Sequence, residues 1–183
     1  VPLAAINFAF DKARIYFFFF FQQEIAAKAE AIHVEHIVEP KASIAGPTLQ
    51  GLAFTHEEPN LKEMYLNLLA TAMDGRAATL AHPAFVEIIK QLDSEDARLV
   101  RGVLQSPSPI PIAQIHRTLK DNKGFNLLFQ HLLNLTNSTT KEPVEDPQLP
   151  AMIDNWIRLG LVEVAYDKHL TDMAQYAWVD QRP

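Results

Sequence analysis

Two clusters of titratable residues have side chains of the types that could do chemistry. The first comprises His33, Glu35, His36 and Glu39. Imidazole and carboxylate groups are ligands for zinc or iron. However, Pro40 disfavours a helix through this segment, and no second pair of ligands is evident elsewhere. We therefore expect surface or capping roles for this cluster, and the sequence predicts no metal site.

The second cluster lies at the ends of two predicted helices and comprises Asp74, Arg76, His82 and Glu87. These residues would either form a polar site where helix ends face each other or act as caps and loop hydrogen-bonding groups. The structural role is the commoner one, because helix ends leave backbone groups that need partners. Glu87 stands among apolar residues, which favours an ion pair with Arg76 or Lys90 over a role as an acid or base.

The sequence contains no recognisable catalytic pattern. It has no G-x-S-x-G turn, no glycine-rich phosphate loop and no H-E-x-x-H pair. The absence of cysteine excludes disulfides and thiolate ligands and fits a reducing compartment. We therefore expect a cytoplasmic, non-enzymatic protein with no cofactor and no small-molecule ligand.

A run of five phenylalanines is the most unusual feature of the chain: Phe17, Phe18, Phe19, Phe20 and Phe21. It lies in a glycine-free stretch, Val1–Ile32, that predicts one long helix. The uncharged window Ile15–Gln23 is far shorter than the roughly 20 residues that span a bilayer. Five rings would surround the helix, so we expect it to pack against the core or a second protomer, or to bind a partner or a membrane surface.

The segment Ile44–Leu92 predicts the helical core. Leu61, Tyr65, Leu68 and Ala72 recur at the spacing of one helix face. Asp74-Gly75 ends that helix, and His82-Pro83 begins another. We expect a mainly α (α+β) protein, with a helical domain over residues 1–93 that includes the long first helix.

Residues 94–183 predict a second, winged-helix-like domain with a small antiparallel sheet. A helix follows Asp93, a strand is expected over Ile110–Ile115, and Phe125–Leu135 has helical spacing. A helix over Leu149–Leu159 ends at Gly160, and strands near Leu161–Tyr166 and Tyr176–Val179 would form the wing. A turn at Asn122–Gly124 and a loop over Asn137–Pro150 separate these elements.

The helix over Leu149–Leu159 would be the recognition helix of a winged-helix DNA-binding protein. It offers Asn155 and Arg158 as candidate contact residues. Affinity for DNA comes mainly from neutralised phosphates, and the chain has a net charge of −6. Nucleic acid is therefore a less favoured partner than protein.

Several segments resemble the abortive infection alpha (Abi-alpha) family, a bacterial family of unknown function. They are Ile37-Val38-Glu39-Pro40, Ile44–Pro47 (IAGP), Leu61–Asp74 (LKEMYLNLLATAMD), His82–Leu92 (HPAFVEIIKQL) and Ile153–Glu163. The resemblance covers residues 32–180 and implies a link to phage defence, but it supplies no established chemistry.

Together, these observations predict a non-enzymatic protein-interaction module, with a role in phage defence implied by the resemblance alone. A protein partner or self-association is expected. The alternatives are a winged-helix DNA-binding regulator and a protein that associates with a membrane surface through its aromatic N-terminal helix.

Overall fold

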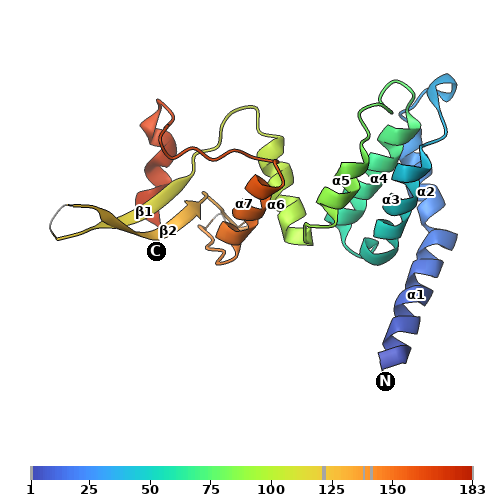
Figure 1. The fold of residues 1–183 in the computed structure, drawn as a ribbon, viewed down its shortest axis with the longest axis horizontal. Coiled ribbons are helices and arrows are strands. Elements are labelled where there is room, and N and C mark those ends of the chain that lie inside the picture. The colour runs from blue at the N-terminus through green and yellow to red at the C-terminus, as the bar shows by residue number, and fades with distance from the viewer. Residues whose placement is uncertain (1, 121–122, 138, 141, 183) are drawn as a thin grey trace. The chain divides into compact units, whose positions relative to one another are not determined.

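The computed structural model describes residues 2–120, 123–137, 139–140 and 142–182. The chain forms two compact units, Val1–Leu99 (unit 1) and Val100–Pro183 (unit 2), which are described separately (Figure 1). The described residues are mainly helical, with one small two-stranded antiparallel sheet. The predicted mainly α (α+β) fold class is confirmed.

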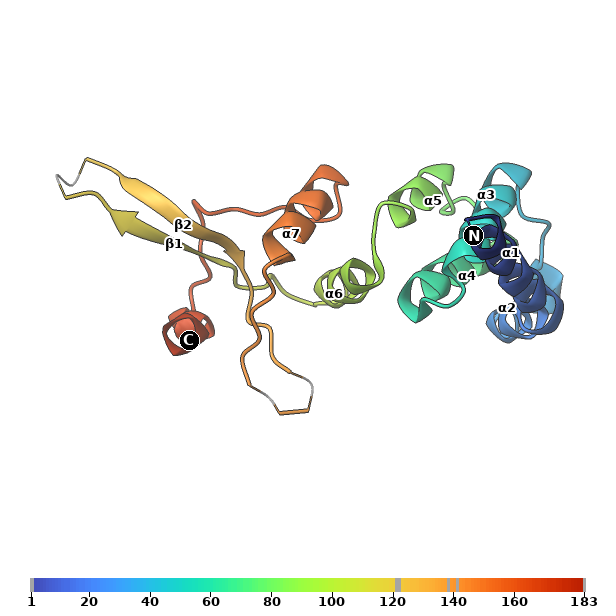
Figure 2. The same ribbon diagram turned by 90° about the horizontal axis from the view of Figure 1, so that it is seen from below.

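Unit 1 is entirely helical in its described elements. They are α1 (Pro2–Phe19), α2 (Phe21–Ala29), the 3₁₀-helix η1 (Val34–His36), α3 (Ala42–Thr55), α4 (Pro59–Met73) and α5 (Pro83–Ile89). The helix α6 (Ser94–Leu104) runs across the boundary into unit 2. The helices α3 and α4 pack side by side at the centre of unit 1, and α5 lies against both (Figures 1 and 2).

The helix α4 follows the pattern expected from its sequence. Pro59 stands in its first turn, where its missing N–H is not needed, and Asp74 caps its C-terminus. Its buried residues recur at three- and four-residue spacing: Leu61, Tyr65, Leu66, Leu68, Leu69 and Ala72. The core helices predicted over Ile44–Leu92 are therefore confirmed.

A glycine sets how closely α3 and α4 approach each other. A Cβ atom added at Gly51 would lie 2.3 Å from Cζ and 2.7 Å from the hydroxyl oxygen of Tyr65. The Tyr65 side chain is only 1% exposed, so its ring has little room to withdraw. The Tyr65 ring of α4 thus occupies the space that the side chain of any other residue at position 51 would fill.

The long N-terminal helix expected over Val1–Ile32 is interrupted, so that prediction is wrong in part. Phe20 has φ −114° and separates α1 from α2. The hydrogen bonds from Phe20 N–H to the Tyr16 carbonyl (2.9 Å) and from Glu24 N–H to the Phe20 carbonyl (3.0 Å) persist through the bend. With this bend, α1 lies against α3 and α2 lies against α4. Val1 lies outside the described residues.

Unit 2 combines a hairpin with two helical segments. Its elements after α6 are β1 (Ala113–Thr118), β2 (Phe125–Leu132), α7 (Leu149–Arg158) and the 3₁₀-helix η2 (Met173–Gln181). The strands pair antiparallel, with His116 opposite Leu127 and Thr118 opposite Phe125. The register shifts on either side of Ile115. The first strand begins after Pro111, later than the Ile110 start that its isoleucines predict.

The helix predicted over Phe125–Leu135 is wrong, because most of this segment is β2. Apolar residues fall at helical spacing there, but Phe125, Leu127 and Phe129 also alternate as a strand requires. A short apolar run is ambiguous by period alone, and pairing with β1 satisfies its backbone groups as a strand.

The wing strands predicted after α7 are also wrong. The described residues 161–172 form no strand, and residues 173–181 form η2. The hairpin precedes α7 in the chain instead of following it (Figure 2). The winged-helix arrangement is therefore not confirmed.

The helix α7 itself agrees with its prediction. Leu149, Met152, Ile153 and Trp156 form its buried face. Gly160 follows its end at φ +70°, where a residue with a side chain would be strained. The N–H groups of Gly160 and Leu161 donate to the carbonyls of Ile157 (3.0 Å) and Trp156 (2.9 Å), the Schellman pattern.

Two predicted connections lie partly outside the described residues. Asn122 of the turn expected at Asn122–Gly124 is one such residue, and Ser138 and Lys141 of the expected loop Asn137–Pro150 are two others. Among the described residues, Gly124 has φ +153°, and its carbonyl accepts a hydrogen bond of 3.0 Å from the Leu119 N–H.

Replacing Gly51 by alanine would place a methyl group against the ring of Tyr65. We expect Gly51→Ala to lower the free energy of unfolding of unit 1 by about 1–3 kcal/mol, as overpacking of a core does. Thermal and denaturant unfolding followed by far-ultraviolet circular dichroism would measure the change.

The matched control is Gly102→Ala in α6, since no atom lies within 4 Å of the position of the added Cβ. Alanine should stabilise that helix by up to about 1 kcal/mol. Equal effects of the two substitutions would contradict the steric explanation.

Candidate functional site

The aromatic run in unit 1 is anchored by the residue that precedes it. Tyr16 is buried, and its ring stacks on His56 of α3, with centroids 4.9 Å apart. Its hydroxyl donates to Glu24 Oε2 at 2.7 Å. Burial, together with this carboxylate, raises the pKa of Tyr16 far above its usual value, so the phenol stays protonated as a hydrogen-bond donor.

Ion pairs hold α1 and α2 against the neighbouring helices on both sides of Tyr16. Lys12 Nζ donates to Glu57 Oε1 at 2.7 Å, and Lys62 Nζ donates to Glu24 Oε1 at 2.6 Å. A third pair joins Lys28 of α2 to Glu63 of α4. These contacts and Tyr16 fix the rotation of α1 and α2, and hence which phenylalanines face outward.

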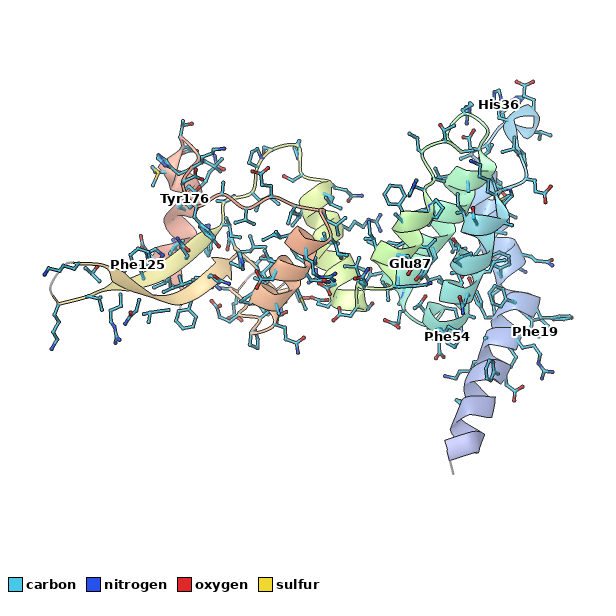
Figure 3. All side chains as sticks on the ribbon, viewed as in Figure 1. Phe19, His36, Phe54, Glu87, Phe125 and Tyr176 are labelled. Atoms are coloured by element: carbon cyan, nitrogen blue, oxygen red, sulfur yellow. The ribbon has the colours of Figure 1, made fainter. Side chains whose placement is uncertain are left out.

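The predicted five-residue patch is divided into two groups. Phe17 and Phe21 are half-buried and meet Tyr16 edge to face, with centroids 5.3 and 6.3 Å away. Phe18, Phe19 and Phe20 are between 53% and 75% exposed. Phe18 and Phe19 contact each other edge to face at 4.8 Å, and Figure 3 shows Phe19 on the outer side of α1. We call the residues Phe18, Phe19 and Phe20 the phenylalanine surface.

Two further exposed aromatic residues of α1 were missed by considering only the consecutive run. Phe8 and Phe10 are each 62% exposed, and Ile15 is 48% exposed. The composition indicates that some phenylalanines must be exposed, because the chain of 183 residues has 11 of them, more than its small core buries. The exposed aromatic residues therefore extend along α1 beyond the phenylalanine surface.

Of the second predicted cluster, the described contacts join only Asp74 and Arg76. Arg76 Nε and its terminal nitrogen donate to the two oxygens of Asp74 at 2.9 and 2.7 Å, and the Arg76 backbone N–H donates to Oδ1 at 3.0 Å. These hydrogen bonds lower the pKa of Asp74 to about 2. Asp74 also forms an isolated bridge with Ile37, which ties η1 to the end of α4.

The other two members of this cluster have local structural roles. The ring of His82 accepts from the Ala84 N–H at 3.1 Å and so caps α5. Glu87 is exposed and pairs with Lys90 at 2.9 Å, which agrees with one of its two expected partners. The cluster is thus a set of caps and local pairs, as the structural alternative predicts.

The candidate contact residues of α7 interact with each other. Arg158 donates to the side-chain oxygen of Asn155 at 2.5 Å. Asn155 is half-buried and Arg158 is exposed, and neither belongs to the buried face of α7.

A hydrogen-bond network centred on a buried histidine in unit 2 was not predicted from the sequence. His131 of β2 is buried and has φ +57°, a conformation that is uncommon outside glycine. The hydroxyl of Tyr166 lies 3.0 Å from both the backbone nitrogen and ring Nδ1 of His131. His131 Nε2 lies 3.0 Å from Asp154 Oδ1. Residues 131 and 166 are 35 positions apart, so no local spacing could have joined them.

The hydrogen-bond directions follow from the backbone. The phenol oxygen accepts from the His131 N–H, so its own hydrogen is available to donate to Nδ1. Nε2 then carries the ring proton and donates to the carboxylate of Asp154. The network joins β2, α7 and the segment after α7 through the imidazole of His131.

This network has the connectivity of a nucleophile, a base and an orienting carboxylate. Burial raises the pKa of the Tyr166 phenol; the hydrogen bond from the His131 N–H lowers it, and the charge of Asp154 raises it. The phenol therefore stays protonated and serves the network as a hydrogen-bonding group.

Two features that the described residues lack bear on other functions. Among them, no group of three or more histidine, aspartate or glutamate side chains is placed to hold a metal ion. No helix in this part of the chain has both the length and the apolar character needed to cross a bilayer.

Comparison with known proteins gives one match. A family model described as Abortive infection alpha matches residues 14–183. No curated protein and no solved structure matches the chain. The matched range contains both units except for the first residues of α1, so it includes the phenylalanine surface and the His131 network.

The Asp74–Arg76 contact predicts a specific titration. Because the folded-state pKa of Asp74 is depressed from 3.8 to about 2, its contribution to stability is present above pH 3.8 and is lost as the pH falls toward 2. Carboxyl NMR titration should give a pKa near 2, and Arg76→Gln should return it toward 3.8. Lys90→Gln is the control, and an unchanged value in Arg76→Gln would contradict the assignment.

Removing the phenol of Tyr166 should destabilise unit 2. Tyr166→Phe leaves the buried Nδ1 and N–H of His131 without their partner, so we expect a loss of about 1–3 kcal/mol in the free energy of unfolding. Both tryptophans, Trp156 and Trp178, lie in unit 2, so their fluorescence during denaturation reports on this unit.

Asp154→Asn serves as the comparison, since an amide oxygen can still accept from Nε2. We expect it to cost less than Tyr166→Phe. Identical stability of Tyr166→Phe and the parent protein would contradict the network described above.

Proposed function

The chain belongs to the abortive infection alpha family, and from this membership we propose that it is a non-enzymatic protein-interaction module acting in phage defence. The phenylalanine surface carries the proposal. The family description supports the biological setting, and the exposed aromatic side chains support the mode of action.

The first support is energetic. Burying a phenylalanine side chain that is otherwise exposed gains about 1.5–3 kcal/mol. Phe18, Phe19 and Phe20 are consecutive and mostly exposed, so a partner that covered all three would gain several such contributions at one place. Aromatic residues clustered in this way often dominate the energy of protein interfaces.

The second support is the rigidity of the surface. Tyr16, packed against His56, holds the helix directly before the phenylalanine surface. The Lys62–Glu24 pair holds the helix directly after it. A surface that is already ordered loses less conformational entropy when a partner binds.

The third support is the absence of charge next to the rings. The sequence from Ile15 to Gln23 contains no charged residue. Charged residues are depleted at the centres of protein interfaces, where they would lose hydration without gaining a partner. A protein surface, from another protein or a second copy, therefore suits this segment.

A phage-plating experiment tests the proposal. A bacterial strain expressing the protein is challenged with a broad phage panel, beside a strain without the gene. We expect reduced plating on the expressing strain, and we expect Phe18→Ser/Phe19→Ser/Phe20→Ser to abolish that protection. These side chains are exposed, so circular dichroism should show the variant folded.

Phe54→Ser is the matched control, because Phe54 of α3 is also an exposed phenylalanine of unit 1 and is 67% exposed. It should keep the protection. Equal plating on both strains across the panel would refute the role in defence, and full protection by the folded triple variant would refute the role of the phenylalanine surface.

A further inference from the structure

The β1–β2 hairpin presents an uncovered apolar face. Residues paired across an antiparallel ribbon point to the same side, so Phe125 and Leu127 share one face with their partners Thr118 and His116. Phe125 is 57% exposed and Leu127 is 45% exposed. His116 stacks on Phe125, with ring centroids 4.0 Å apart and the ring planes 6° from parallel.

The opposite face of the hairpin also exposes an apolar residue. Phe129 pairs with Ile115 across a register shift, so it lies on this second side, and it is 60% exposed. Leu119, just beyond β1, is exposed as well. An isolated two-stranded hairpin is at best marginally stable in water. We therefore expect a binding partner to cover these exposed apolar side chains when the protein acts.

The apolar surface continues from the hairpin into a groove of about 590 Å³. Leu128 and Phe129 belong to both, and Pro147 and Pro150 line its other side together with Glu145 and Asp146. Glu145 is paired with Arg182. The apolar surface of β2 therefore ends at a groove wall that also carries acidic residues.

The hairpin is basic in a protein that is otherwise acidic. Residues 113–132 contain Arg117, Lys120 and Lys123 against one acidic residue, Asp121, a net charge of +2. The whole chain carries −6, so the remaining residues together carry −8. The positive charge is concentrated toward the turn end of the ribbon, which extends away from α7 (Figure 1).

We propose that the β1–β2 hairpin binds the surface of an anionic phospholipid bilayer, with Phe125 and Leu127 in the headgroup region and Lys120 and Lys123 against lipid phosphates. Aromatic and leucine side chains favour this interfacial layer, and long lysine side chains reach the headgroups from it. Basic residues near an anionic surface strengthen such binding.

A bilayer explains the combination better than other partners do. A protein docking on one face of the ribbon would leave either Phe129 or the Phe125 face exposed, whereas lipid can surround both. Nucleic acid would match the lysines, but leucine side chains cannot stack with bases as aromatic rings do. The helices α1 and α2 carry a net charge of +1, from Lys12, Arg14 and Lys28 against Asp11 and Glu24, which is less than the +2 of the hairpin.

Flotation of the purified full-length chain with lipid vesicles tests this inference. The protein should float with phosphatidylcholine vesicles that contain phosphatidylglycerol, and should stay at the bottom with phosphatidylcholine alone. Each lysine near the surface changes the partition coefficient about fivefold, so Lys120→Gln/Lys123→Gln should lower it about 25-fold. Raised salt should weaken the binding of the parent protein.

Lys41→Gln/Lys168→Gln is the matched control, since it removes the same charge from exposed lysines outside the hairpin. It should change the partition coefficient by less than about twofold, because neither lysine belongs to the surface proposed to contact the lipid. Circular dichroism and tryptophan fluorescence would verify that both variants are folded.

Three outcomes would overturn the proposal. One is failure of the parent chain to float with anionic vesicles. Another is loss of flotation in Phe18→Ser/Phe19→Ser/Phe20→Ser while the hairpin variant still floats. The third is salt-sensitive retention of single-stranded DNA without any vesicle binding. The test uses no phage and different residues, so its failure would leave the proposed defence function standing.

Discussion

The space left by the missing side chain of Gly51 is the constraint on which unit 1 depends. The ring of Tyr65 occupies that space, so α3 and α4 approach closely enough to bury the apolar face of α4. The turn between the two helices then provides Glu57, and α4 provides Lys62 and Glu63; these residues hold α1 and α2 by ion pairs. The close packing of α3 against α4 thus determines, through these ion pairs, that the phenylalanine surface faces outward.

The helices of unit 1 could be predicted because several independent signals agree on the same segments. Pro59 and Pro83 mark helix starts, Asp74 marks an end, and the apolar spacing between them has only a helical explanation. In unit 2, Phe125–Leu132 fits either period, and only its pairing with β1 decides for a strand. Strand pairing depends on residues distant in sequence, which local patterns do not contain.

The candidate site shows the same division between local and distant information. The aromatic run is visible in the sequence, but burial by Tyr16 and the bend at Phe20 determine that Phe17 and Phe21 face inward. The link between His131, Asp154 and Tyr166 spans three elements of unit 2. No spacing rule relates these residues, because the fold alone brings them together.

Because β2 carries no charged residue, the two edges of the sheet differ in how readily they can pair with a further strand. Within the described residues, β2 pairs with β1 alone, so each strand keeps one free edge. The edge of β1 has two register shifts and carries Arg117, features that oppose the addition of another strand. The edge of β2 carries no charged side chain and is rich in phenylalanine and leucine. An incoming strand should therefore pair with the edge of β2 and not with the edge of β1. Strand exchange, aggregation in concentrated solution and the formation of cross-β assemblies should accordingly depend on Phe125–Leu132.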